Sequence, residues 1–168
     1  LLDLAARSGC RGLLLGFESL CEGSIKETGK AFNLRRSYRD VIERIHARGI
    51  AIQGCFVFGF DHDGPDVFDD TAEFVLSAHV DLPRFAILTP FPGTPLFNRF
   101  NSQSRILTRN WELYDGQHVV FQPKNMSIQE LQEGHERTWR KVYSLGSIAK
   151  RIGKSRTQLP IAVMANLG

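Results

Sequence analysis

Three short stretches of the sequence place carboxylate, polar or proline residues directly after an apolar run. They read GFES at 16–19, FGFDHDG at 58–64 and TPFPGTP at 89–95. If the apolar runs are parallel strands, their carboxyl ends meet at one edge of the sheet, where α/β proteins bind their ligands. The spacing therefore predicts one shared site built from three separate segments.

Glu18 is the candidate in the first stretch. A carboxylate at a strand end can accept two hydroxyl hydrogen bonds, as a ribose diol requires. The alternative is a plain helix start, because Ser19 and Glu22 match the S-x-x-E capping box. That box accounts for Ser19 and leaves Glu18 without a role, so we interpret Glu18 as a site residue.

The second stretch offers Gly59 for close approach of the backbone to a ligand, followed by Asp61, His62 and Asp63. Consecutive side chains diverge, so these last three are not expected to form a metal site. We interpret Asp63 as part of a solvated turn that leads into a helix N-cap.

Gln53 is the polar residue inside the central apolar run. It shares a face with Cys55 and Val57, because successive side chains of a strand alternate between two faces. A polar side chain in such a run needs a hydrogen-bonding partner. Gln53 is therefore expected to face a barrel interior or a ligand.

The elements that would position these residues alternate along the chain. Near-continuous apolar runs at 11–17, 50–58 and 84–89 are typical of strands buried on both faces, and amphipathic helical patterns separate them. The alternation indicates βαβ units and a parallel sheet. The predicted fold class is α/β, with half of a TIM-like barrel over residues 1–100 and a mostly helical extension over residues 101–168.

Local signals predict where several helices begin. Ser37 is an expected N-cap with Asp40 three residues later, and Gly49 is a natural stop. The prolines of LTPFPGTPLF predict a rigid strand exit, with Pro95 at the start of a short helix.

In the extension we expect a turn at Asp115-Gly116, a short strand at 118–121 and a helix at 159–168. A capping box of Ser127 and Glu130 predicts a long helix or a kinked pair of helices. The stripe expected to be buried on it consists of Ile128, Leu131, Thr138, Val142, Leu145 and Ile152.

The amino-acid composition limits the classes of protein to which the chain can belong. A chain of 168 residues with 42% hydrophobic content can bury a real core. No apolar stretch reaches the roughly 18 residues of a membrane span. Three widely spaced cysteines indicate neither a disulfide framework nor a zinc site, so a cytoplasmic setting is expected. The chain begins at Leu1 with a helix already under way, which suggests a piece of a longer protein.

The net charge of +3 is unevenly distributed. The segment HERTWRKVYSLGSIAKRIGKSR carries basic residues with Glu136 as its one acid. This segment could be a surface for nucleic acid or acidic lipid. The interpretation we favour is the solvated face of a helix, with no nucleic acid expected as a partner, because no base-stacking motif accompanies the charge.

Taken together, GCRGLLLGFES, VIERIHARGIAIQGCFVFGFDHD and FAILTPFPGTPLF resemble the second half of a radical S-adenosylmethionine enzyme core. The segment ILTRNWELYDGQHVVFQPKNMSIQELQEG resembles the C-terminal extension of the subgroup that carries an N-terminal cobalamin-binding domain. The two resemblances cover residues 1 to about 153. They rest on the order and spacing of motifs that are weak individually.

The resemblance implies a role for particular residues. In the family, a polar residue that ends the fourth barrel strand contacts the cofactor's ribose, and Glu18 takes that place. Backbone of the next strand approaches adenine, which here implies Val57 and Gly59, with Gln53 on the same strand. The family's first glycine and its glutamate are replaced by Cys55 and His62. Residues that leave the sixth strand flank the adenine, which assigns Leu88, Pro90 and Phe91.

The resemblance also implies what should lie elsewhere. The family's C-x-x-x-C-x-x-C motif is absent, so no metal site is expected in these residues. The implied cofactors of the parent enzyme are S-adenosylmethionine and a 4Fe-4S cluster, with cobalamin as a further possibility through an N-terminal domain. The implied partners are the N-terminal half of the same chain and a small-molecule or lipid-like substrate.

On this interpretation the piece alone is inactive, and its open edge favours a homodimer. The alternative is a non-catalytic α/β module that binds a partner through its basic helical tail.

Overall fold

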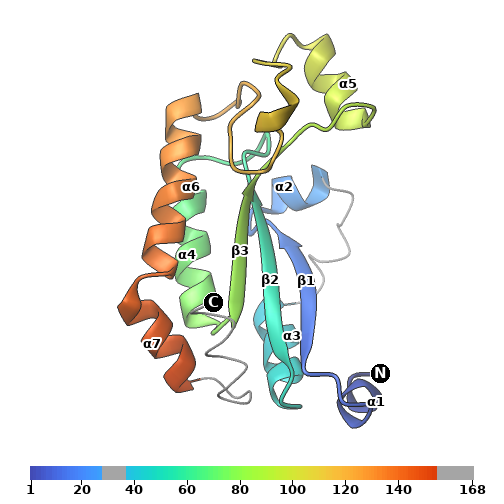
Figure 1. Cartoon of the computed structure of the whole chain (residues 1–168), viewed down its shortest axis with the longest axis vertical. Coiled ribbons are helices and arrows are strands. Elements are labelled where there is room, and N and C mark those ends of the chain that lie inside the picture. The colour runs from blue at the N-terminus through green and yellow to red at the C-terminus, as the bar shows by residue number, and fades with distance from the viewer. Residues whose placement is uncertain (28–36, 155–168) are drawn as a thin grey trace.

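The computed structural model describes residues 1–27 and 37–154, so the helix predicted at 159–168 lies outside the described residues. Helices and strands alternate through the first two thirds of the chain (Figure 1). In chain order the elements are α1 (Leu2–Arg7), β1 (Gly12–Glu18), α2 (Glu22–Glu27), α3 (Tyr38–His46), β2 (Ala51–Phe58), α4 (Val67–Ser77), β3 (Leu82–Ile87), α5 (Pro95–Ser102), the 3-10 helix η2 (Trp111–Leu113), α6 (Ile128–Val142) and α7 (Leu145–Lys154).

The three strands form one parallel sheet in the order β1-β2-β3. This confirms the predicted order and direction, with β3 beginning at Leu82 rather than at residue 84. Their carboxyl ends point toward α2 and α5, whereas α1 lies beyond the opposite end of β1 (Figure 1). The barrel curvature expected from the sequence stays a prediction, since three strands define only an open sheet.

Predicted helix starts are confirmed in atomic detail. Ser37 caps α3 by accepting from the Asp40 N–H, and Ser127 and Glu130 form the full capping box of α6. Pro95 occupies the first turn of α5, behind a Thr94 cap. Serine and threonine hydroxyls satisfy N–H groups that a helix leaves unpaired at its start, which is why these local signals could be read from sequence.

Helices α3, α4 and α6 cover one face of the sheet, and we call this the covered face. Large aromatic side chains fill it. Phe56 and Phe85 lie with ring centroids 5.9 Å apart, Phe58 meets Phe68 of α4 edge-to-face at 4.9 Å, and Trp139 of α6 meets Phe85 at 5.4 Å. Aromatic pairs in such geometry contribute about 0.5–1.5 kcal/mol beyond the area they bury. This core positions the strand ends.

The extension protects the outer edge of β3. The Tyr143 hydroxyl donates to the Pro83 carbonyl at 2.7 Å, and the His135 Nε2 atom lies 3.2 Å from the Phe85 carbonyl oxygen. The Ile87 N–H donates to the Gly116 carbonyl at 2.7 Å. Backbone groups of an open edge are a site for unwanted pairing, so the extension shields this edge.

Parts of the predicted extension are wrong. In place of a strand at 118–121, the described residues there make one isolated antiparallel bridge, between Ile106 and Phe121. Ile128 and Leu145 are 38% and 81% exposed rather than buried. The predicted kinked pair is confirmed as α6 and α7, and the shift in helix direction between them takes Leu145 away from the core. Leu131, Thr138 and Val142 are buried as predicted.

Candidate functional site

The first strand end turns sharply at Glu18. The β1–β2 register shifts between Gly16 and Glu18, which makes Phe17 an extra residue on β1. Glu18 has a φ of 65°, and the Ser19 N–H donates across it to the Phe17 carbonyl at 2.9 Å. A three-residue turn of this hand is rare and strained. Strained backbone clusters at functional sites, so the geometry favours a ligand-binding role for the Glu18 carboxylate.

Asp63 is buried, which corrects the predicted solvated turn. Only 1% of the Asp63 residue surface is exposed to solvent. The carboxylate accepts from the Gly59 and Phe60 N–H groups at 3.0 and 3.1 Å, and from the Ser24 hydroxyl at 2.6 Å. Burial raises the pKa of Asp63, and these donors oppose that rise. Asp63 therefore fixes the loop after β2 from the inside.

Ser19 joins this network instead of capping a helix. Its hydroxyl lies 3.5 Å from Asp63 Oδ1 and accepts from the Cys21 N–H at 3.0 Å, while α2 begins only at Glu22. The predicted capping box is therefore wrong. Because Asp63 contacts serines from the β1–α2 segment, it holds the first and second strand ends in a fixed relation to each other.

Gly59 is required by the backbone itself. Its φ is 101°, and a Cβ atom there would lie 3.0 Å from Leu131 and 3.1 Å from Phe121. The space beside Gly59 is thus filled by the extension, which explains the glycine without a ligand. Contact between the Gly59 backbone and a cofactor stays a prediction.

Asp61 is the centre of an ion cluster that the sequence did not reveal. Its carboxylate lies 2.7 Å from Arg105 Nη1 and 2.9 Å from Lys124 Nζ. Burial raises the pKa of Asp61, but the hydrogen bonds from Lys124 and Arg105 outweigh burial, so its pKa lies below the usual value. The Asp61 N–H donates to Glu27 at 3.2 Å, and Glu27 in turn pairs with Arg99. The cluster fastens the extension to the second strand end.

The third strand end keeps its predicted residues close to the other two. The Leu88 N–H donates to the Phe58 carbonyl at 2.8 Å, which prolongs the parallel ladder past β3. Pro90 is buried, and Phe91 is 53% exposed. Leu88 also lines a pocket of about 430 Å³ between α2 and α5, together with Glu27, Phe60, Thr94, Pro95, Leu96 and Arg99.

No described helix covers the opposite face of the sheet, which we call the uncovered face. Gln53, Cys55 and Val57 share it, as their alternation predicts, and all three are half-buried. Gln53 lies five residues before Phe58, roughly 16 Å below the strand end at about 3.3 Å per residue. It therefore does not join Glu18 and Leu88 at the rim.

Arg84 is the residue of this face that sequence reasoning missed. Because β3 begins at Leu82, Arg84 is a mid-strand residue paired with Cys55, and not the start of the strand. Burial raises the pKa of the Cys55 thiol, the charge of Glu18 raises it further, and Arg84 opposes both. Glu18 and Arg84 thus act on Cys55 from the two neighbouring strands.

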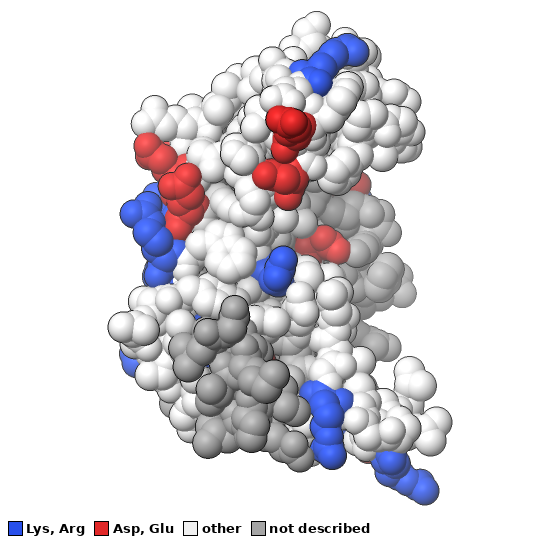
Figure 2. Space-filling view, in the orientation of Figure 1, with Lys and Arg blue, Asp and Glu red and all other residues white. Residues whose placement is uncertain are grey.

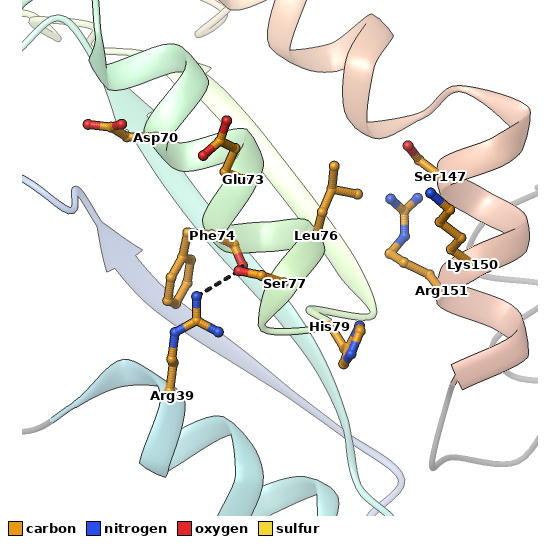
Figure 3. Close-up of a pocket in the computed structure, with 10 residues that line it drawn as sticks. All are labelled: Arg39, Asp70, Glu73, Phe74, Leu76, Ser77, His79, Ser147, Lys150 and Arg151. Atoms are coloured by element: carbon orange, nitrogen blue, oxygen red, sulfur yellow. Dashed lines mark hydrogen bonds between the residues drawn. The ribbon is translucent and has the colours of Figure 1, made fainter.

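A larger pocket lies elsewhere among the described residues. About 760 Å³ opens between α3, α4 and α7, on the far side of the helices from the uncovered face (Figure 3). Arg39 donates to Ser77 at 2.6 Å there, and Asp70 points away from Lys150 and Arg151. Charges of both signs line it without converging on one point, so it is a weaker site candidate than the strand ends.

The basic residues of the extension are partly used within the chain. Lys141 pairs with Asp69 at 2.9 Å, Arg137 lies over the Phe68 ring, and the buried Arg151 donates to the Val142 carbonyl. On the face shown in Figure 2, lysines and arginines are scattered rather than gathered. Within residues 1–27 and 37–154, no helix has the length and apolar character needed to span a bilayer.

Among residues 1–27 and 37–154 no set of thiolates suits an iron–sulfur cluster, and binding of S-adenosylmethionine at the strand ends stays a prediction. Cys10, Cys21 and Cys55 are free and belong to three different elements or loops. The described residues contain no group of His, Cys, Asp or Glu able to hold a metal ion. A 4Fe-4S cluster needs several thiolates together. A carboxylate at a strand end suits ribose hydroxyls, and the exposed Phe91 ring suits an adenine face.

Comparison with known proteins finds similarity to methyltransferases and to a cyclase. The chain is 39% identical over 150 residues to bacteriochlorophyllide d C-12(1)-methyltransferase of Chlorobaculum tepidum, covering 89% of this chain and 32% of that protein. It is 31% identical over 115 residues to the C-8(2)-methyltransferase of the same organism, covering 68% and 26%. It is 24% identical over 147 residues to the anaerobic magnesium-protoporphyrin IX monomethyl ester cyclase of Cereibacter sphaeroides, covering 85% and 23%.

The chain thus spans about a third or less of these relatives. No protein-family model matches the chain. Among solved structures, the radical S-adenosylmethionine methyltransferase TsrM from Kitasatospora setae, with cobalamin and a [4Fe-4S] cluster bound, superposes with a TM-score of 0.55 at 19% identity. The match covers 90% of this chain and 33% of that one, and it shows a shared fold.

Proposed function

We propose that this chain is the part of a radical S-adenosylmethionine methyltransferase that contributes the ribose and adenine side of the cofactor site and part of the substrate cavity. One observation carries the proposal: 39% identity over 89% of the chain to a bacteriochlorophyllide methyltransferase. The match extends over 150 of the 168 residues, so it takes in most of the sheet together with the extension.

Each proposed site residue has a distinct task. The Glu18 carboxylate accepts hydrogen bonds from the ribose hydroxyls, and its strained turn holds it in place before the ligand arrives. Leu88, Pro90 and Phe91 flank the adenine from the third strand end. Bound S-adenosylmethionine supplies the transferable methyl group and, on one-electron reduction, radical chemistry.

The Asp63 network holds the two strand ends in register. Asp63 contacts the Gly59 and Phe60 N–H groups on one side and Ser19 and Ser24 on the other. Buried polar groups that are fully hydrogen-bonded rigidify their surroundings. The adenine-side backbone and Glu18 therefore keep a constant separation.

The remaining parts of the site are proposed to come from outside these residues. The cluster ligands would be supplied by the larger part of the protein that the relatives possess and this chain does not span. Cobalamin is a proposed further cofactor, supported by the fold shared with TsrM. The substrate is proposed to be a tetrapyrrole, since two of these relatives are named for bacteriochlorophyllide d and the third for magnesium-protoporphyrin IX monomethyl ester.

The test is methyl transfer by the complete protein that contains this chain. After anaerobic reconstitution with iron, sulfide and cobalamin, and with a one-electron reductant such as dithionite, it should consume S-adenosylmethionine and add one methyl group to bacteriochlorophyllide d, as measured by mass spectrometry. Residues 1–168 alone, treated identically, should neither hold a stable cluster nor cleave the cofactor. A complete protein that leaves S-adenosylmethionine intact contradicts the proposal and favours a non-catalytic, partner-binding module.

A further inference from the structure

Arg84 stands apart from the other side chains of the sheet. Across the three strands it is the one basic residue, and it lies in the middle of β3 on the uncovered face. Its neighbours along that face of β3 are Leu82 and Ala86, and its partner across the sheet is Cys55. Its side chain is exposed.

The Arg84 guanidinium has no acceptor among residues 1–27 and 37–154. Other cations of the chain do have partners, such as Arg105 on Asp61 and Lys141 on Asp69. Glu18 is the acidic residue of the sheet, yet its carboxylate is not within 4.0 Å of the Arg84 guanidinium. Arg84 therefore has five N–H donors available in a fork that matches a carboxylate geometrically.

The residues paired laterally with Arg84 across the sheet, which we call its row, leave space above the uncovered face. Gly16, Cys55 and Arg84 lie side by side across β1, β2 and β3. Two of the three side chains are small or absent, whereas the interior of a filled barrel is packed with large branched residues. A row with this composition suits a bound molecule better than it suits interdigitating side chains.

The surroundings of that space are mostly apolar, with Gln53 as the polar residue of the row below. Leu14 is 67% exposed one row below, and Val57 pairs with Ala86 one row above. A molecule that lies on this face therefore meets aliphatic side chains on both sides and a single cation between them. That combination selects an apolar body with one anionic substituent.

Excluding water from the uncovered face would make the charge of Arg84 energetically more important. If the face lines a cavity, Arg84 loses its water, and a desolvated charge with no partner is strongly unfavourable. A bidentate carboxylate removes that penalty and is among the strongest hydrogen-bonded pairs available to arginine. A neutral ligand of the same shape would leave the penalty in place.

We propose that Arg84 is a substrate-specificity residue that binds the carboxylate of a large apolar carboxylic acid lying on the uncovered face. The inference rests on the proposed function, because that function makes the uncovered face a wall of the substrate cavity. It goes further by naming the group of the substrate that is recognised and the side chain that recognises it.

The experiment compares an acid with its ester in the complete protein. The probes are bacteriochlorophyllide d and the methyl ester of its propionate, with binding followed by tetrapyrrole fluorescence in the absence of reductant. A hydrogen bond to a charged group contributes about 1.5–3 kcal/mol, so the wild type should bind the acid roughly 10- to 150-fold more tightly than the ester. Arg84→Gln should lose that preference, because the substitution weakens binding of the acid and leaves binding of the ester unchanged.

Two further variants make the result specific. Arg84→Lys keeps the charge without the fork, and should retain part of the preference. Arg44→Gln removes an exposed arginine from α3, on the covered side, and should bind both probes as the wild type does. Circular dichroism of each variant should match the wild type, because Arg84 makes no described contact that supports the fold.

Labelling of Arg84 with phenylglyoxal, read by peptide mass spectrometry, identifies what covers it. The proposal expects reaction in the free protein, protection by the acid and no protection by the ester. Protection without any ligand would mean that an acidic residue elsewhere in the protein pairs with Arg84, and this overturns the proposal.

Equal binding of acid and ester by the wild type overturns the proposal as well, as does a preference that survives Arg84→Gln or the failure of both probes to bind. These outcomes are independent of cofactor consumption. An Arg84-dependent preference without methyl transfer would therefore contradict the proposed function alone, and methyl transfer without the preference would contradict this inference alone.

Discussion

The two faces of the same three-stranded sheet differ in the size, polarity and burial of their side chains. On the covered face, Phe56, Phe58 and Phe85 are each no more than 2% exposed and pack against rings from the helices. On the uncovered face, Gln53, Cys55 and Arg84 are small, polar or charged and lie between aliphatic residues such as Leu14 and Val57. Packing on the covered face stabilises the fold, whereas the uncovered face leaves space and polar groups for a ligand.

The contrast teaches how one strand can serve both purposes. Side chains alternate with a period of two, so every second residue of β2 can be chosen for packing and the rest for chemistry. The Asp63 network then fixes the strand ends without using either face. Substitutions on the two faces should therefore have separable consequences.

The largest expected effect comes from emptying the covered face. Phe85→Ala should lower the free energy of unfolding by about 3–5 kcal/mol, because it leaves a cavity against rings that cannot collapse into it. Val57→Ala, on the uncovered face of the neighbouring strand, should cost less than about 1 kcal/mol. Urea denaturation followed by tryptophan fluorescence measures both, since Trp139 packs on Phe85. Equal losses would remove the distinction between the faces.

A smaller effect is expected where α6 approaches α4 on the covered face. A Cβ at Gly134 would overlap the Phe68 ring, so Gly134→Ala should destabilise by about 1–3 kcal/mol despite the better helix propensity of alanine. Gly146, in α7, has open space around it. Gly146→Ala should be neutral or stabilise by up to about 1 kcal/mol. Thermal unfolding of the two variants should shift in opposite directions or differ clearly in size.

The smallest expected effect is the loss of stability at acidic pH that comes from the buried His135. Burial lowers the pKa of His135, although its contact with the Phe85 carbonyl opposes this. A histidine whose folded pKa is depressed contributes stability above its unfolded value of about 6.5, and that stability is lost as the pH falls through the folded pKa. The unfolding midpoint should therefore drop between about pH 7 and pH 5.

His135→Gln is the matched variant for this pH dependence. It keeps a polar side chain at the α6–β3 contact but removes the titrating ring, so the difference between the two profiles belongs to His135. Asp63, whose pKa is raised, acts in the opposite direction and is present in both proteins. Parallel profiles would show that His135 does not titrate in this range.

Sequence reasoning succeeded where the governing interactions are local. Strand alternation, the Ser37 and Ser127 caps and the position of Pro95 depend on residues within four positions of one another. It failed where partners are distant in the chain. Asp63 looked solvated because its donors at Ser19 and Ser24 lie 44 and 39 residues away.

The candidate site shows the same division. The position of Glu18 at a strand end could be predicted, but its bulge and strained turn could not, because they depend on pairing with β2. Arg84 was missed for a related reason, since its face is set by register rather than by composition. The ion partners of Asp61 come from Arg105 and Lys124, in an extension with weak periodicity.

Calorimetric titration of S-adenosylmethionine into the complete protein tests the central claim most directly. Glu18→Gln keeps the shape of the side chain but loses the charge, and charge-assisted bonds contribute about 1.5–3 kcal/mol, so affinity should fall roughly 10- to 150-fold. Ser19→Ala is the control next to it: Ser24 and the Gly59 and Phe60 N–H groups still hold Asp63, so this variant should cost about 1 kcal/mol of stability with little change in affinity. The reverse pattern, in which Ser19 governs affinity and Glu18 only stability, would contradict the assignment of Glu18 to the cofactor site.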